Sequence, residues 1–186
     1  GYPGTMAAPY MDYIIGDKIL FGLSDQNDYT EKLVFLPHSY QPNDRRRSIS
    51  AAELTREEFG LNRDQFVFCC FCNAYKISPE TFDGWMRILG RVEGSMLWLF
   101  VENESAKSNL KKAAASRGID PERVVFAGKA ELSKHLARHR LADLFLDTLP
   151  YNAHTTTSDA LWAGLPVLTQ IGKAFAGRVA ASLLYA

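Results

Sequence analysis

The chain has 186 residues, of which 47% are hydrophobic and 12% aromatic, a composition typical of a packed globular protein and not of a disordered one. Its 21 basic residues balance its 21 acidic ones, so net charge favours neither nucleic acid nor an anionic membrane as a partner. No apolar run reaches the roughly 20 residues that span a bilayer, and no secretory signal is visible. We therefore expect a cytoplasmic protein without nucleic-acid or membrane partners.

The first 40 residues predict two short strands joined by polar turns. Residues 1–10 are rich in Pro and Gly and indicate a loop. MDYIIGD at 11–17 predicts a strand, the polar residues 22–31 predict a turn that leads to a helix start, and KLVFLP at 32–37 predicts a second strand.

The segment 39–49 is the best candidate for a linker, because it combines Pro, Asn, Asp and a short basic run. That run, Arg45 to Arg47, has polar neighbours, which favours a solvated surface over a binding patch. Ser50 or Thr55 then caps a predicted short helix that stops at Gly60.

From residue 65 onward, apolar runs alternate with amphipathic segments. Helices are expected from Ser78, over 105–117, over 131–140, from Thr155 and over 174–186, and the five predicted strands are 65–72, 96–101, 123–128, 141–147 and 165–169. The strand runs are continuously apolar, which is typical of strands buried on both faces of a parallel sheet between helix layers. We therefore predict an α/β fold with a Rossmann-like parallel sheet.

Three cysteines, Cys69, Cys70 and Cys72, lie together in the first of these strands. Residues so close in a strand are poor disulfide partners, and the second pair of ligands that a zinc site needs is missing. We expect buried, reduced thiols.

In parallel sheets, ligands bind at the carboxyl ends of the strands, which selects the loops 72–78, 127–131 and 147–157. Lys76 follows a buried strand and precedes the cap at Ser78, where it is placed either to meet an anion or to be a solvated surface lysine. His135 and Arg138 are three residues apart on the helix that follows the second loop, so they either meet a base edge or are exposed.

The third loop gives the strongest signal. His154 is followed by Thr155, Thr156 and Thr157, which are poor residues inside a helix but good ones at its start. Hydroxyls and free N–H groups at a helix N-terminus favour a bound phosphate, and an ordinary helix cap is the alternative. Asp159, one turn further on, is placed either for a ribose hydroxyl or simply as a favourable charge near the helix start.

No G-x-G-x-x-G or Walker lysine loop occurs, and no His/Glu metal constellation is present. A phosphate held by a lysine, a histidine and a helix N-terminus requires no metal, so we expect neither a metal nor another cofactor.

Four segments together resemble the catalytic region of O-linked N-acetylglucosamine transferases, and more narrowly the bacterial, tetratricopeptide-linked members of glycosyltransferase family 41. These segments are GYPGT with MDYII, NAYKISPETFDGWMRIL, LADLFLDTLPYNAH and HTTTSDALWAGLPVLT. The resemblance extends over essentially the whole chain, in matched order and spacing.

The resemblance implies a two-domain GT-B fold with the donor in the cleft between two Rossmann-like domains. It implies a metal-independent, inverting transfer of N-acetylglucosamine from UDP-GlcNAc to protein Ser or Thr hydroxyls, with a helical-repeat domain upstream that captures acceptor proteins. On this pattern, residues 1–40 are the last part of the N-terminal domain, residues 41–60 are a linker with a short helix, and residues 61–186 are a truncated C-terminal domain. We expect an internal piece of a longer protein, inactive by itself because the acceptor-side residues lie upstream.

Carried over residue by residue, the resemblance assigns catalysis to Lys76, which stabilises the leaving diphosphate, and to His154. The nucleotide-sugar-binding positions are Asn73, Ala130, His135, Arg138, His154, Thr155, Thr156 and Asp159, with Asp159 on the ribose and Ala130, His135 and Arg138 on the uracil side. Two positions depart from the pattern. Asn73 lies where the family often has Gln, and Leu132 lies where the animal enzymes have a nucleotide-contacting lysine.

Two alternatives stay open. The same fold could use another donor, such as GDP-fucose in relatives resembling the SPINDLY type or a UDP-hexose. Alternatively, the chain could be a nucleotide-binding or scaffold module without catalytic activity. His154 and Asp159 favour the UDP-N-acetylglucosamine type.

Overall fold

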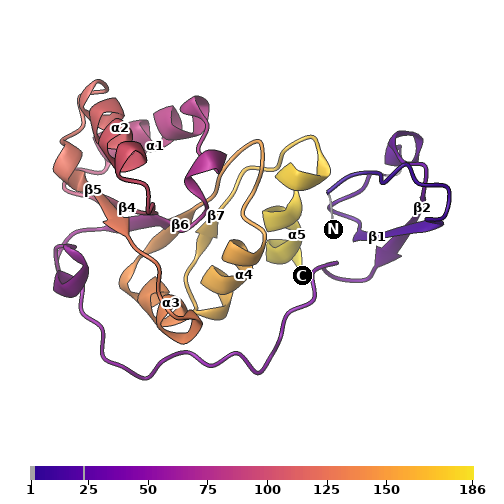
Figure 1. The fold of residues 1–186 in the computed structure, drawn as a ribbon, viewed down its shortest axis with the longest axis horizontal. Helices are drawn as coiled ribbons and strands as arrows, with labels where there is room; N and C mark the ends of the chain where they lie inside the picture. Colours follow the sequence, from indigo (N-terminus) through magenta and orange to yellow (C-terminus); the bar gives the residue numbers. More distant parts are fainter. Residues whose placement is uncertain (1–2, 23) are drawn as a thin grey trace.

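The computed structural model describes residues 3–22 and 24–186, and it contains two parallel sheets of unequal size. The smaller sheet pairs β1 (Tyr13–Asp17) with β2 (Lys32–Leu36). The larger sheet has five strands in the order β5-β4-β3-β6-β7. Figure 1 shows the small sheet at one end of the molecule, joined to the large one by a long purple segment of coil.

The large sheet confirms the predicted α/β fold. All its neighbouring strands are parallel. The strands are β3 (Val67–Cys70), β4 (Met96–Phe100), β5 (Val124–Ala127), β6 (Leu144–Leu146) and β7 (Val167–Leu168). Each strand is shorter than the apolar run that predicted it, because burial continues past the last ladder hydrogen bond. Phe71 and Cys72, for example, are buried but lie beyond the end of β3.

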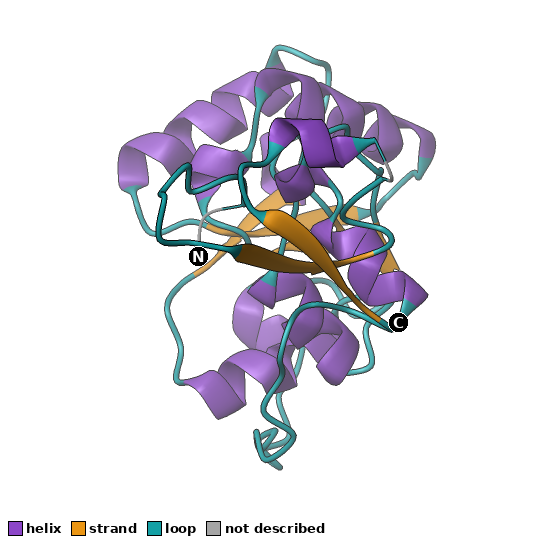
Figure 2. Ribbon diagram, turned by 90° about the vertical axis from the view of Figure 1, so that its right-hand side faces the viewer, coloured by secondary structure: helices purple, strands orange, loops and turns teal. Residues whose placement is uncertain are grey.

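Helices cover both faces of this sheet (Figures 1 and 2), with α1 and α2 on one side and α3 and α4 on the other. The α-helices are α1 (Pro79–Arg91), α2 (Glu104–Ala115), α3 (Leu132–Arg138), α4 (Thr155–Trp162) and α5 (Val179–Tyr185). Single 3₁₀ turns are η1 (Asp25–Asp28), η2 (Glu57–Phe59), η3 (Ala74–Lys76), η4 (Pro121–Arg123), η5 (His139–Leu141) and η6 (Phe175–Gly177). Over the two described stretches, no helix is both long and apolar enough to cross a membrane.

The predicted start of α1 is confirmed. The Ser78 hydroxyl accepts a hydrogen bond from the Thr81 backbone N–H at 3.2 Å, and Pro79 occupies the first helical position. This arrangement satisfies an N–H group that the helix leaves unpaired, and proline is favoured there because its missing N–H is not needed. The helix then buries Phe82, Trp85, Met86 and Leu89, the stripe that its 3.6-residue period predicts.

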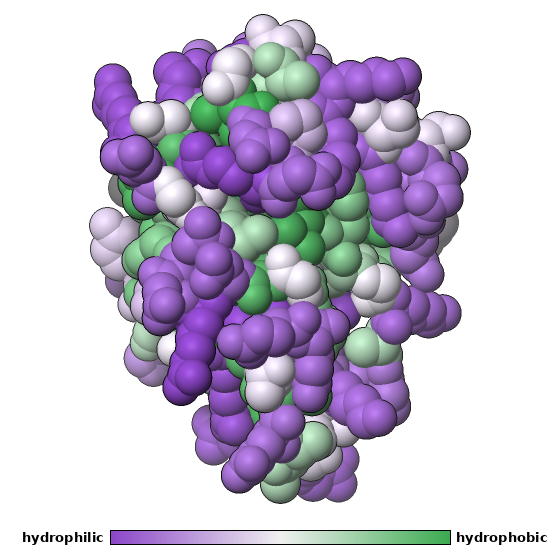
Figure 3. Space-filling view, turned by 90° about the vertical axis from the view of Figure 1, so that its left-hand side faces the viewer, coloured by the Kyte–Doolittle hydropathy of each residue, from purple (hydrophilic) through white to green (hydrophobic). Residues whose placement is uncertain are grey.

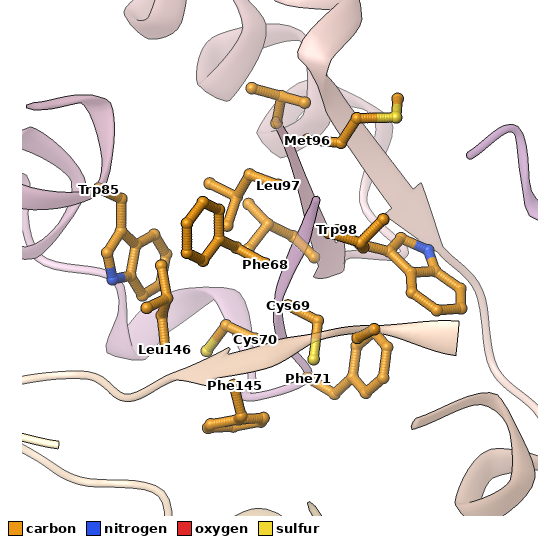
Figure 4. Close-up of a cluster of buried hydrophobic side chains, with 14 of the residues drawn as sticks. Phe68, Cys69, Cys70, Phe71, Trp85, Met96, Leu97, Trp98, Phe145 and Leu146 are labelled. Carbon is orange, nitrogen blue, oxygen red and sulfur yellow. The ribbon is translucent and has the colours of Figure 1, made fainter. Parts of the chain in front are cut away.

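The core lies between the sheet and its two helix layers. Figure 4 shows Trp98 and Phe71 packed together on one side of Cys69, with Trp85 and Leu146 on the other. The rings of Phe71 and Trp98 meet edge to face, with centroids 5.0 Å apart. All three cysteines are buried free thiols, as predicted.

A second, smaller core joins the N-terminal residues to the C-terminal ones. Leu20 and Phe21 pack with Phe175 and Val179, and the rings of Phe21 and Phe175 lie 5.5 Å apart. Asp17 strengthens this junction, since its carboxylate accepts hydrogen bonds from the Ser182 hydroxyl at 2.6 Å and the Tyr40 N–H at 3.0 Å. The N-terminal segment that carries the small sheet is therefore attached to η6 and α5.

Two predicted helices differ in detail. The short helix expected to stop at Gly60 is the 3₁₀ turn η2, which does end at Gly60, but its N-cap is Arg56 and neither Ser50 nor Thr55 caps it. The helix expected over 174–186 is η6 followed by α5, which begins at Val179. The predicted loop 1–10 includes residues 1 and 2, and the predicted turn 22–31 includes residue 23, which lie outside the described residues.

Figure 3 shows the side of the molecule on which Figure 1 labels β5, α1 and α2. Hydrophilic side chains dominate this surface, and hydrophobic atoms are visible mainly in a band across its middle. Such a band is expected where a sheet edge lies between two helix layers.

Gly164 ends α4 with a φ of 85°, in the left-handed region that a side chain makes unfavourable. An added Cβ would meet nothing within 4 Å, so only the backbone conformation penalises a substitution. We expect Gly164→Ala to lower the free energy of unfolding by about 1 kcal/mol in urea denaturation. Gly128→Ala is the matched control, since Gly128 also faces open space but has no positive φ. Equal effects of the two substitutions would contradict this interpretation.

Candidate nucleotide-diphosphate site

The strand order reverses direction between β3 and β6, which are neighbours in the sheet although two strands separate them in the sequence. In parallel α/β sheets, this reversal opens a crevice at the carboxyl ends of the two strands, where ligands bind. The loop with Lys76 leaves β3 and the loop with His154 leaves β6. Two of the three loops selected from the sequence therefore meet at this crevice.

Lys76 links these two loops directly. It ends η3, and its Nζ donates a hydrogen bond to the Asn152 carbonyl at 2.9 Å. The same ammonium lies 4.2 Å from the centroid of the Tyr151 ring, within cation–π range. Lys76 is thus half-buried against the 148–153 loop and is not a fully solvated surface lysine.

His154 immediately precedes α4, and its ring stacks on Tyr151 with centroids 4.8 Å apart. Its Nε2 lies 3.2 Å from the Ala176 carbonyl, so the neutral ring carries its proton on Nε2 and donates it there. Burial lowers the pKa of His154 against the opposing effect of the Ala176 hydrogen bond, and the nearby Lys76 charge lowers it further. The ring is therefore neutral near pH 7, with Nδ1 as its free nitrogen.

The threonines at the start of α4 do not act as caps. His154 occupies the N-cap position, and its side chain makes no capping hydrogen bond. Thr157 donates to the Ala153 carbonyl at 3.0 Å, Thr156 Oγ1 lies 3.3 Å from the Cys72 Sγ, and Thr155 is exposed. The first N–H groups of an α-helix have no partner within the helix, so this end offers free donors beside Lys76.

Asp147 organises the loop between β6 and α4, a role that the sequence analysis missed. Its Oδ1 accepts from the backbone N–H groups of Thr148 at 2.7 Å and Ala153 at 2.6 Å, and its Oδ2 accepts from the Thr169 hydroxyl at 2.6 Å. Burial raises the pKa of Asp147 to about 6, against the effect of these hydrogen bonds. The only signal in the sequence was that an apolar strand ends at an acidic residue.

Replacing Asp147 should therefore destabilise the chain. Asp147→Ala leaves two backbone N–H groups and one hydroxyl without their acceptor, and we expect a loss of about 3 kcal/mol in the free energy of unfolding. Urea denaturation at pH 7.5 measures this loss. Asp64→Ala, at an exposed carboxylate, should change the free energy of unfolding by less than about 0.5 kcal/mol. A similar effect of the two substitutions would refute the role of Asp147.

The predicted base side lies at α3. Ala130 is exposed in the loop before this helix, and His135 is half-buried. Burial lowers the pKa of His135 to about 3, so its ring is neutral near pH 7. Arg138 is buried, so it is not the exposed residue that was one of the two expectations, and its side chain contacts the protein interior. Its Nη1 donates to the Gly128 carbonyl at 2.7 Å, and its guanidinium lies 4.6 Å from the centroid of the Phe71 ring.

Asp159 is buried on α4, where it forms an ion pair with Arg47 from the predicted linker. The interpretation of Arg45 to Arg47 as a solvated run is therefore wrong for Arg47, whose side chain is 14% exposed, whereas that of Arg46 is 92% exposed. Burial raises the pKa of Asp159, and Arg47 opposes this shift. Asn73, the remaining predicted contact, is exposed at the start of η3.

A cavity of about 510 Å³ opens beside this site. Its walls come from the start of α1, from Leu149 and Pro150 in the 148–153 loop, and from residues 170–174 after β7. Within residues 3–22 and 24–186, no group of three or more His, Cys, Asp or Glu side chains is arranged to hold a metal ion.

Comparison with known proteins identifies the family. A family model described as Glycosyl transferase family 41 matches residues 1–53 and 45–186. The chain belongs to this family. A probable UDP-N-acetylglucosamine–peptide N-acetylglucosaminyltransferase SEC of Arabidopsis thaliana is 39% identical over the whole chain, and a probable SPINDLY transferase of Petunia hybrida is 32% identical over 99% of it.

Among solved structures, a mutant of the Thermobaculum terrenum O-GlcNAc transferase superposes with a TM-score of 0.84 at 33% identity. The match covers 98% of this chain and 34% of the solved one. The chain spans about 20% of the length of the curated family 41 relatives it matches. The predicted α/β fold with a parallel sheet and the family 41 resemblance are thus confirmed.

Proposed function

We propose that this chain forms the donor-nucleotide part of a transferase that moves N-acetylglucosamine from UDP-GlcNAc to Ser and Thr hydroxyls of proteins. Membership of family 41 and the activities that name its relatives support this donor and this acceptor. One observation carries the proposal. The Lys76 ammonium is hydrogen-bonded to the loop that leads into α4, so a cation and a helix N-terminus converge where the strand order reverses.

The chemistry follows from where charge develops. As the bond between the sugar and UDP breaks, negative charge grows on the diphosphate. Lys76 and the first N–H groups of α4 are donors already held in place, so they stabilise this charge more than the ground state. The Thr155 and Thr156 hydroxyls at the same helix end add further donors. His154 gains a second N–H only by protonation at Nδ1, which an adjacent diphosphate favours.

The nucleoside then extends from α4 toward α3. Asp159 accepts a ribose hydroxyl, and the loop at Ala130 with His135 borders the uracil. Arg138 holds the loop before α3 in place, because it donates a hydrogen bond to the Gly128 carbonyl and packs on the Phe71 ring. Leu132 is exposed at the first position of α3 and offers the base an apolar surface instead of an ammonium. We assign Asn73 to the sugar side of the nucleotide sugar, and the cavity beside Pro150 to the sugar itself.

We also propose a GT-B arrangement, with residues 1–40 as the last part of an N-terminal Rossmann-like domain, residues 41–60 as the linker and residues 61–186 as the C-terminal domain. The separate parallel pair of β1 and β2 supports this division. Tyr13, Ile15 and Val34 are exposed on this pair, whereas parallel sheets are normally covered on both faces. Acceptor-side residues and a helical-repeat domain that binds acceptor proteins would lie upstream in the full-length protein.

Transfer without a metal is part of the proposal, because Lys76 and the helix N-terminus supply the positive charge that a metal ion would otherwise bring. The test is a transfer assay on the full-length protein with UDP-GlcNAc, an acceptor protein and EDTA. We expect modified Ser or Thr residues by mass spectrometry, with EDTA lowering the rate less than twofold.

The same assay separates the alternative functions. Transfer from GDP-fucose or a UDP-hexose in place of UDP-GlcNAc would change the donor and keep the fold. Binding of UDP without transfer or donor hydrolysis would indicate a nucleotide-binding module without catalytic activity. The names of both relatives state UDP-N-acetylglucosamine as the donor, which favours UDP-GlcNAc here.

A further inference from the structure

The segment 43–50, which we call the strap, lies across α4 and reaches α3. Figure 1 shows this purple coil passing below both helices. Asn43 Oδ1 accepts a hydrogen bond from the Ser158 hydroxyl at 2.5 Å, and the Ser50 N–H donates to the Ser133 carbonyl at 3.1 Å. The strap therefore connects the two helices to which we assign the ribose and the base.

Arg47 is the central contact of the strap. Its Nη1 pairs with Asp159 Oδ1, and its guanidinium lies 5.5 Å from the centroid of the Trp162 ring. The Trp162 indole N–H in turn donates to the Arg47 carbonyl at 3.2 Å. The backbone and the side chain of Arg47 are thus both fixed against the face of α4 that carries Asp159 and Trp162.

Stability alone does not account for this contact. Arg47 Nε and Nη2 are buried and find no acceptor within the described residues, and unsatisfied buried donors of this kind are destabilising. Buried ion pairs are weak contributors to stability even when all their hydrogen bonds are made. The ion pair instead fixes the orientation of the Asp159 carboxylate. Arg47 holds Oδ1, whereas Oδ2 has no hydrogen-bond donor among the described residues.

We propose that Arg47 is a positioning residue for nucleotide binding, which holds Asp159 ionised and oriented so that Oδ2 accepts a ribose hydroxyl. This inference rests on the proposed function, in which Asp159 is the ribose ligand. Arg47 is the charged group that acts on this carboxyl among the described residues, and the strap and helix neighbours Asn43, Ser158 and Trp162 are uncharged at neutral pH. Without Arg47, burial would favour the protonated acid, which is a poorer acceptor.

The test compares UDP with 2′,3′-dideoxy-UDP by calorimetry on the full-length protein. The wild type should bind UDP roughly tenfold more tightly, as a hydrogen bond to a carboxylate predicts. Arg47→Gln should reduce this ratio to nearly one, and more completely at pH 5.5 than at pH 7.5. Titration of the diphosphate itself cancels in the ratio. Arg47→Lys should restore much of the preference, and Arg46→Ala, at an exposed neighbour, should leave it unchanged.

The possible failures are distinguishable. If Arg47→Gln keeps the wild-type ratio at both pH values, Arg47 does not position Asp159 and the inference is overturned. If the wild type binds UDP without preferring it over the dideoxy analogue, the ribose role of Asp159 fails together with that of Arg47. If the wild type binds no UDP, the proposed function itself is wrong.

Discussion

Replacing Lys76 by alanine should reduce turnover by a factor of roughly 10²–10³ in the full-length protein, corresponding to about 3 kcal/mol or more of lost transition-state stabilisation. The expectation follows from the position of the ammonium between the loops that leave β3 and β6, where the leaving diphosphate would accumulate charge. Because that charge is greatest in the transition state, kcat should fall more than KM rises. Steady-state assays with UDP-GlcNAc measure both constants.

Two further variants separate lost charge from lost structure. Lys76→Met keeps most of the apolar stem that packs beside Tyr151 and should be as inactive as the alanine variant. Lys112→Ala removes an exposed lysine on α2 and should have wild-type activity. Thermal unfolding should place both Lys76 variants within a few degrees of the wild type. Turnover of Lys76→Met within threefold of the wild type would exclude the proposed role.

The largest effect on stability is expected for Trp98→Ala. Trp98 is fully buried in β4 and touches the rings of Phe59, at 5.1 Å, and Phe71, at 5.0 Å between centroids. Its removal leaves a cavity in the core beside Phe59 and Phe71. We expect a loss of about 3–5 kcal/mol in the free energy of unfolding, measured by urea denaturation.

Trp98→Phe tests how much of this loss comes from packing. The Trp98 Nε1 is buried without a hydrogen-bond partner among the described residues, so phenylalanine removes an unsatisfied donor as well as volume. We expect Trp98→Phe to retain most of the stability that Trp98→Ala loses. Tyr75→Ala, at a side chain that is 83% exposed, is the surface control. A loss below about 1 kcal/mol for Trp98→Ala would contradict its assignment to the core.

The parallel sheet could be predicted from the sequence because its signals are local. Continuous apolar runs such as MLWLF indicate strands buried on both faces, and Ser78 with Pro79 marks a helix start without reference to any other part of the chain. The same logic selected the loops at Lys76 and His154, since loops at the carboxyl ends of parallel strands lie at one edge of the sheet.

Contacts between distant segments could not be predicted in this way. Arg47 and Asp159 are 112 residues apart, and nothing in the basic run distinguishes the arginine that turns inward from its two exposed neighbours. The sequence indicated only that a strand ends at Asp147. Two of its three hydrogen-bond donors belong to residues six and 22 positions further along the chain, which the folded loop brings back to the carboxylate. The contacts of Arg47 and of Asp147 depend on tertiary packing, which a local sequence pattern does not encode.

The most direct test of the site is the affinity difference between UDP and uridine, measured by calorimetry on the wild-type and Lys76→Ala full-length proteins. If Lys76 and the start of α4 bind the diphosphate, the wild type should bind UDP at least about 100-fold more tightly than uridine, and Lys76→Ala should reduce that ratio by about tenfold or more while uridine affinity is unchanged. Equal UDP-to-uridine ratios in the two proteins would show that the diphosphate binds elsewhere.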